Sequence, residues 1–203
     1  MRDIRFIILN KQEILGNKQI INVLTDSYGR LTLVYRSNKK SCLLDYFKVY
    51  FGTIREPSHS EMSNLNSCEL ISEFNNIPLN YKKFREGFEI IKFLLDNTIT
   101  NTGNDILFTS LKKCLSNLNN VDVVTTEHIS LMKLIFLYQE GLLPNNLSGT
   151  NSSVSESQKK QQMKELLKYA LLWENRPNFS DAFWNSFSAW INAICKINNL
   201  KLT

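Results

Sequence analysis

The clearest signal for the fold lies in residues 18–36, KQIINVLTDSYGRLTLVYR. This stretch contains two apolar runs with many β-branched residues, Lys18–Thr25 and Leu31–Arg36, and such runs are typical of strands. Between them lies Asp26-Ser27-Tyr28-Gly29, where Asp and Ser bond their own backbone and Gly accepts a positive φ. The stretch therefore predicts a β-hairpin.

Runs of the same kind flank the hairpin on both sides. Ile4–Leu9 precedes it, and Leu43–Phe51 and Leu65–Phe74 follow it. Five short strands without a convincing helix between them fit a small barrel, closed or partly open.

After Pro78 the spacing of apolar residues changes from two to 3.6, which indicates helices. Asn80 is the expected N-cap of the first helix. Further helices are expected after Asn104, after Thr125 or Thr126, over Gln158–Trp173, and after Ser180. Residues 145–157 are small and polar and predict a flexible loop. The expected class is α+β, with a β domain over residues 1–79 and an all-helical domain over residues 80–203.

The charge of the chain is concentrated near its start. The 203 residues include 24 Lys and Arg against 19 Asp and Glu, a net charge of +5. Residues 1–55 hold ten basic and four acidic side chains, a balance that favours binding to a polyanion.

The cysteines and the apolar runs narrow the class of protein. The four cysteines lie far apart, which argues against a disulfide-dense secreted domain and against the common zinc modules. No secretory leader and no run of the ~20 apolar residues that a membrane helix requires is visible. We therefore expect a cytoplasmic protein without a metal or cofactor.

Motifs for catalysis are missing from the sequence. It contains no Gly-rich phosphate loop, no HExxH and no GxSxG, so we expect no enzyme. Glu86 and Glu89 are expected on a solvated helix face, and His128 is expected to be an ordinary surface or packing residue. Cys114 and Cys195 are expected in the core.

The connection Arg36–Ser41 combines three cations with small hydrogen-bonding residues, a composition suited to phosphates. The alternative is a merely soluble turn. Aromatic residues nearby offer stacking platforms for bases where they face outward, although about two in three should be core. These aromatic residues are Tyr35, Tyr46, Phe47, Tyr50 and Phe51.

The order of these features resembles the RecO family of bacterial DNA repair and recombination mediators. Residues 6–40 carry the likeness as a motif: two apolar strands, Thr25 with Gly29, a third strand, and a basic loop with Arg36, Lys39 and Lys40. Tyr81–Leu95 is placed like the family's first long helix, and Leu131–Pro144 like its segment that ends in Gly and Pro.

The resemblance implies an N-terminal five-stranded OB-fold barrel and a helical domain without enzymatic turnover. It implies binding and annealing of single- and double-stranded DNA. It also implies that the protein, together with RecR, helps RecA to displace single-stranded-DNA-binding protein (SSB), whose acidic C-terminal tail it contacts. Many relatives carry a four-cysteine zinc knuckle where this chain has Asn145–Ser157, which contains no cysteine, so we expect no zinc.

Candidate site residues follow from the charge pattern and the resemblance. The predicted DNA contacts are Arg36, Lys39, Lys40, Arg30, Arg5, Lys11 and Lys18, with Lys48 as a further candidate. The predicted rim of a tail pocket is Lys82, Lys83, Arg85, Lys112, Lys113 and Lys133. Its predicted floor is Phe84, Phe88, Leu111, Leu131 and Ile135, which would otherwise be plain core.

Two other classes of protein stay open on the sequence: a scaffold of a complex that does not bind DNA, and an OB-fold protein that binds RNA.

Overall fold

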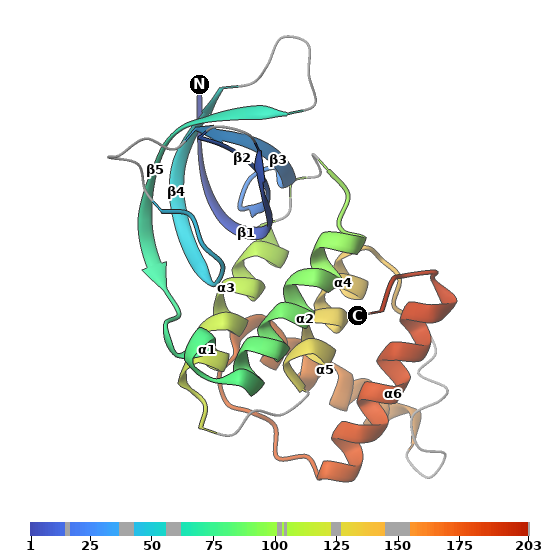
Figure 1. Cartoon of the computed structure of the whole chain (residues 1–203). Helices are drawn as coiled ribbons and strands as arrows, with labels where there is room; N and C mark the ends of the chain where they lie inside the picture. The colour runs from blue at the N-terminus through green and yellow to red at the C-terminus, as the bar shows by residue number, and fades with distance from the viewer. Residues whose placement is uncertain are drawn as a thin grey trace.

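Strands come first and helices follow in the computed structural model of the chain (Figure 1). The structure describes residues 1–14, 17–36, 43–55, 62–100, 103, 105–122, 127–144 and 155–202. The strands are β1 (Arg2–Ile14), β2 (Lys18–Thr25), β3 (Gly29–Arg36), β4 (Lys48–Arg55) and β5 (Ser63–Glu73). The helices are α1 (Asn76–Leu79), α2 (Tyr81–Asn97), α3 (Asp105–Asn120), α4 (Glu127–Gln139), α5 (Glu156–Leu172) and α6 (Asp181–Ile197).

The strands close into a barrel in the order β1-β2-β3-β5-β4. β1 pairs with both β2 and β4, which closes the ring, and β3 pairs with β5 in parallel while the other pairs are antiparallel. A closed five-stranded barrel followed by helices agrees with an OB-fold and a helical domain. The predicted fold class is confirmed.

The turn of the β2–β3 hairpin explains the spacing of Thr25 and Gly29. The Thr25 hydroxyl donates to the Gly29 carbonyl at 2.9 Å and accepts from the backbone N–H of Tyr28 at 2.9 Å. Gly29 has a φ of 64°, a value that a residue with a side chain rarely adopts. One buried hydroxyl and one glycine thus hold the turn.

β1 and β4 differ most from their predicted ranges. β1 runs on past Leu9 to Ile14, because a register shift between Ile8 and Asn10 keeps its polar second half paired with β2. β4 begins at Lys48 instead of Leu43, since Phe47 has a φ of 57° and ends any extended run before it.

The barrel and the helices share a core. Alternate residues of the strands, such as Phe6 and Tyr50, fill the barrel interior. Residues on the outside of the barrel, including Ile7 and Leu24, belong instead to the cluster that the helices form. Gly87 in α2 allows the ring of Phe47 to lie close to the helix backbone, because a Cβ there would lie 2.7 Å from Cε1 of Phe47.

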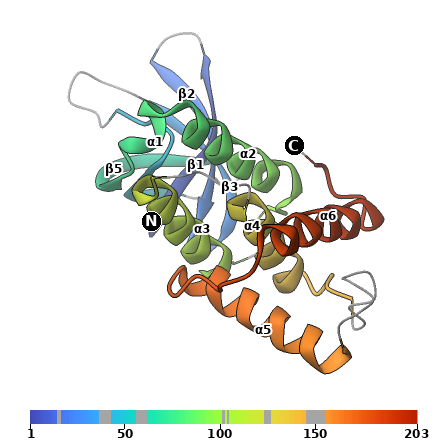
Figure 2. The ribbon, with the colours of Figure 1, turned by 90° about the horizontal axis from the view of Figure 1, so that it is seen from below.

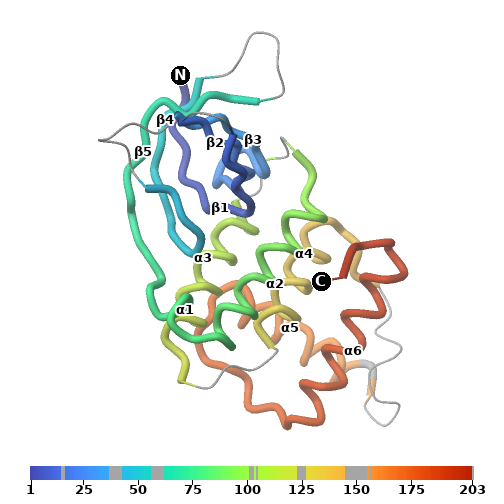
Figure 3. The backbone as a smooth tube through the Cα atoms, in the orientation of Figure 1, coloured from blue at the N-terminus to red at the C-terminus, as the bar shows by residue number. Residues whose placement is uncertain are grey.

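α4 is the central helix of the second domain. It is buried on every side and packs against α2, α3, α5 and α6 (Figure 2). After α6 the chain runs back towards α2 (Figure 3), where the Asn97 side chain donates to the Lys201 carbonyl at 3.0 Å and accepts its N–H at 2.9 Å. Among the described residues, no helix has both the length and the apolar character needed to cross a membrane.

Candidate nucleic-acid interface

The outer side of the β2–β3 hairpin carries a pair of cations at one end. Lys18 and Arg36 are cross-strand partners and are both exposed. Within the described residues neither side chain forms an ion pair. Side chains directly opposite each other in an antiparallel pair lie on the same face. Two positive charges therefore stand side by side and stay available to an anion.

The same face continues with a short apolar and polar surface. Ile20 and Val34 are the next outward pair, and Asn22 and Thr32 follow. All four are half-buried, and the Thr32 hydroxyl donates to the side-chain oxygen (Oδ1) of Asn22 at 2.9 Å. We call Lys18, Ile20, Asn22, Thr32, Val34 and Arg36 the β2–β3 face. Beyond it the helices cover the hairpin at Leu24, which is fully buried.

Arg30 lies on the same side of the hairpin but is held by the helical domain. Its guanidinium Nη1 donates to the Leu95 carbonyl in the last turn of α2. A cation near the C-terminus of a helix stabilises that helix. The environment of Arg30 is therefore that of a residue joining the two domains.

Arg5 and Lys11 are both paired with carboxylates. Arg5 Nε lies 2.7 Å from an Asp26 carboxylate oxygen. Lys11 Nζ lies 3.0 Å from Asp45, and it also lies 5.4 Å from the centre of the Tyr46 ring. Partial burial alone would raise the pKa of Asp45, but the hydrogen bond from Lys11 and the backbone N–H of Tyr46 bring it below the ordinary value. The carboxylates of Asp26 and Asp45 thus largely compensate the positive charges of Arg5 and Lys11.

The remaining predicted DNA contacts lie elsewhere. Lys48 Nζ lies 3.5 Å from a Glu73 carboxylate oxygen. Lys39 and Lys40 lie outside the described residues. Of the predicted basic residues that the structure describes, it brings together Lys18 and Arg36.

Most of the aromatic residues expected near this site are core. Tyr35, Phe47 and Tyr50 are buried, and Tyr46 is half-buried against Phe88. Phe51 is 38% exposed, but it lies opposite Arg5 on the β1–β4 side of the barrel. The platform on the β2–β3 face is thus aliphatic.

The predicted tail pocket in the helical domain is not assembled as expected. Its floor residues Leu111, Leu131 and Ile135 are fully buried core. Lys133 is 5% exposed and donates to the Asn192 side-chain oxygen at 2.9 Å, and burial lowers its pKa. Lys83 is also buried and donates to the Asn119 carbonyl at 2.8 Å. These two lysines are structural residues and not members of a surface rim.

The other predicted rim cations do reach the surface but are dispersed. Lys82 and Arg85 are exposed on α2, and Arg85 lies 3.6 Å from Glu89. Lys112 and Lys113 are half-buried on α3. Phe84 is partly exposed and packs on Phe47 and Phe88.

Glu86 contradicts its expected place on a solvated face. It is 3% exposed, and its carboxylate accepts the backbone N–H of Ile129 in the first turn of α4 at 3.0 Å. Burial raises the pKa of Glu86 to about 7. By contrast, Cys114 and Cys195 are core as predicted, and His128 packs on the Trp173 ring.

Sequence reasoning missed a basic row on α5. Lys160, Lys164 and Lys168 recur every four residues beside the apolar row Met163, Leu167 and Leu171. The four-residue spacing was the available signal, because such residues share a helix face.

The sequence matches no family model and no curated protein. Among the residues that the structure describes, no three His, Cys, Asp or Glu side chains gather in a group that would hold a metal ion.

Proposed function

We propose that this protein binds single-stranded DNA on the β2–β3 face of its barrel. The observation that carries the proposal is the exposed couple Lys18 and Arg36, which forms no ion pair with any residue that the structure describes. It lies beside an aliphatic and amide surface on a closed five-stranded barrel. Barrels of this class bind oligonucleotides across their second and third strands.

Each part of the face has a distinct task in this proposal. Lys18 and Arg36 contact phosphates, which supply affinity without sequence information. Ile20 and Val34 receive the apolar faces of unstacked bases, and Asn22 bonds to base or sugar atoms. A face of this kind holds many sequences equally, which suits a protein that keeps single strands available for annealing.

The finer proposal rests on the resemblance of residues 6–40 to the RecO family. On that basis the protein is a mediator of DNA repair and homologous recombination in the cytoplasm, at the nucleoid. It anneals DNA, and together with RecR it helps to load RecA onto strands coated with SSB, whose tail it contacts. It performs no catalytic turnover.

A salt titration with a fluorescent single-stranded oligonucleotide tests the proposal. The variant Lys18→Ala/Arg36→Ala should bind more weakly, and its plot of log affinity against log salt should be flatter by about 1.4, or roughly 0.7 for each lost phosphate contact. The matched control Lys92→Ala/Lys196→Ala removes two exposed lysines from α2 and α6. The control should keep the slope of the unmodified protein.

Competition by RNA of the same sequence separates the two nucleic acids. Preferential binding of DNA supports the mediator role, and preferential binding of RNA would assign the face to RNA. If neither DNA nor RNA binds at low salt, the protein would be a scaffold without a nucleic-acid ligand.

A further inference from the structure

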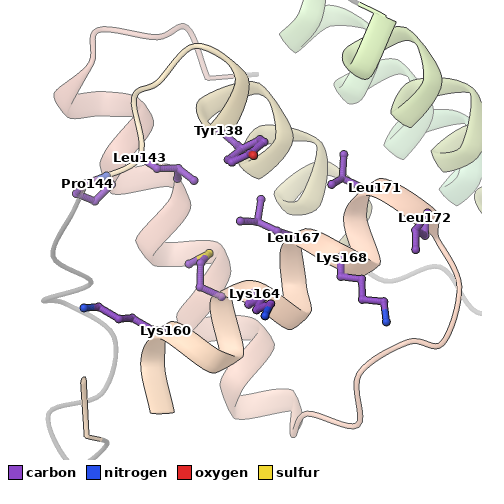
Figure 4. Close-up of a pocket in the computed structure, with 10 residues that line it drawn as sticks. Tyr138, Leu143, Pro144, Lys160, Lys164, Leu167, Lys168, Leu171 and Leu172 are labelled. Atoms are coloured by element: carbon purple, nitrogen blue, oxygen red, sulfur yellow. The ribbon is translucent and has the colours of Figure 1, made fainter. Parts of the chain in front are cut away.

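An apolar groove lies between the end of α4 and the length of α5, on the helical domain. It has a volume of about 700 Å³. Figure 4 shows Leu167 pointing from α5 towards Tyr138 of α4, with Leu143 beside them. Met163 and Leu171 extend this lining along α5.

The groove exists because the helices that pack against α5 cover only part of its apolar face. Leu166, Tyr169 and Ala170 are buried in the shared core. Met163, Leu167 and Leu171, four residues apart, form a second row that is only half-buried. A half-covered apolar row on a helix is a surface on which another helix packs.

A row of three lysines forms one edge of the groove. Lys160, Lys164 and Lys168 are exposed, and none of them forms an ion pair within the part of the chain that the structure describes. Figure 4 shows Lys160 at one end of the row and Lys168 at the other. No acidic side chain of the described residues lines the groove.

We propose that this groove docks an acidic amphipathic helix of a partner protein. The apolar face of that helix covers Met163, Leu167 and Leu171, and carboxylates spaced four residues apart meet the three lysines. Three lysines spaced in this way span about 12 Å, and the lining from Lys160 to Leu172 about 18 Å, the length of roughly three helical turns. The apolar row and the basic row run side by side along this length, which matches a helix that carries both kinds of side chain in parallel rows.

A nucleic acid fits the groove less well than an acidic helix does. Phosphates would use the lysines but leave the leucine and methionine side chains exposed to water, whereas the apolar face of a helix buries them. The groove also lies apart from the barrel, because the barrel packs against α2 and α3. Loss of peptide binding is therefore distinguishable from loss of binding on the β2–β3 face.

Calorimetry with synthetic peptides and the full-length protein tests the proposal. The probe is a capped 15-residue helical peptide with Leu along one face and Glu every fourth residue beside it. The second peptide replaces Leu by Ser, the third replaces Glu by Lys, and the fourth carries a central proline. A fifth, short extended peptide has acidic residues and one terminal apolar residue.

The protein variant Lys160→Glu/Lys164→Glu/Lys168→Glu reverses the rim, and all three side chains are exposed, so the fold should persist. Its matched control is Lys92→Glu/Lys196→Glu/Lys201→Glu, which changes net charge equally at exposed positions outside the groove. We expect the rim variant to weaken binding of the helical peptide by about tenfold or more, and the control by less than about twofold.

We expect the unmodified protein to bind the first peptide and not the Ser, Lys or proline peptides. The rim variant should keep its affinity for single-stranded DNA within about threefold of that of the unmodified protein. Equal binding of the Ser peptide would overturn the proposal, because charge alone would then suffice. Preference for the short extended peptide, or equal weakening of peptide binding by both triple variants, would overturn it as well. So would a loss of DNA affinity confined to the rim variant, which would assign the lysines to nucleic acid.

Discussion

Glu86 places an ionisable group where the structure favours its neutral form. Its carboxyl is buried between α2 and the start of α4, with Glu89, Arg85 and Lys133 as the charged groups that act on it. Burial disfavours the carboxylate, so the folded protein holds the proton more tightly than the unfolded chain does. A pKa of about 7 in the folded state stands against 4.5 for an unperturbed glutamate.

Glu86 should therefore make stability fall as the pH rises from about 4.5 to about 7. Below the lower value both states carry the proton, and above the upper value both have lost it, so the effect is confined to this window. A shift of this size corresponds to roughly 3 kcal/mol. Glu86→Gln keeps an acceptor for the Ile129 N–H and should remove this part of the pH dependence. Urea unfolding of the unmodified protein and of Glu86→Gln at several pH values measures this difference. Parallel plots of unfolding free energy against pH for the two proteins would contradict the prediction.

At the scale of elements, the start of α2 depends on one side chain. The Asn80 side chain accepts the backbone N–H groups of Lys82 and Lys83, at 3.0 and 3.2 Å. No acidic residue in the first turn assists it. α2 in turn packs on the barrel and on α4, so the cap fixes the entry into the helical domain.

Asn80→Ala should lower the free energy of unfolding by about 1 kcal/mol, because two N–H groups lose their acceptor. The matched control is Asn75→Ala. Asn75 precedes α1 without making a side-chain cap bond and donates only to exposed Glu73. This control should change stability by less than about 0.5 kcal/mol. Equal losses in thermal unfolding of both variants would refute the cap's role.

The sequence predicted elements well where the pattern is local. The alternation at Ile21 and Val23 and the cap at Asn80 both follow from near neighbours. α1 was missed because its four residues are too short to show a period. The roles of the charged residues were harder to predict. Arg30 donates to Leu95 and Lys133 donates to Asn192, and each of these partners is about sixty residues away in the sequence. Which cations stay available is decided by these distant contacts.

At the scale of the whole molecule, the barrel and the helices share apolar contacts. Ile7 and Leu24 from the barrel belong to the same cluster as the core of α2 and α3. Separating the two parts would expose these side chains to water. The two domains should consequently unfold together.

A single unfolding transition is therefore expected from probes in both parts. Trp173, Trp184 and Trp190 are the three tryptophans and report on the helical domain, while hydrogen exchange of β2 and β3 amides reports on the barrel. Leu24→Ala should lower the free energy of unfolding by about 2 to 5 kcal/mol, and by the same amount whether it is measured in the barrel or in the helical domain. Val34→Ala on the open face should cost about 1 kcal/mol or less. Two separate transitions would mean that the barrel folds independently.

Single-stranded DNA is proposed to lie on the β2–β3 face. Backbone amide shifts measured by nuclear magnetic resonance, with and without a saturating thymidine oligonucleotide, test it most directly. The largest changes should cluster at residues 18–22 and 32–36, and reaching them in Lys18→Ala/Arg36→Ala should require a higher oligonucleotide concentration. Changes centred on α5, or spread evenly over the surface, would contradict it.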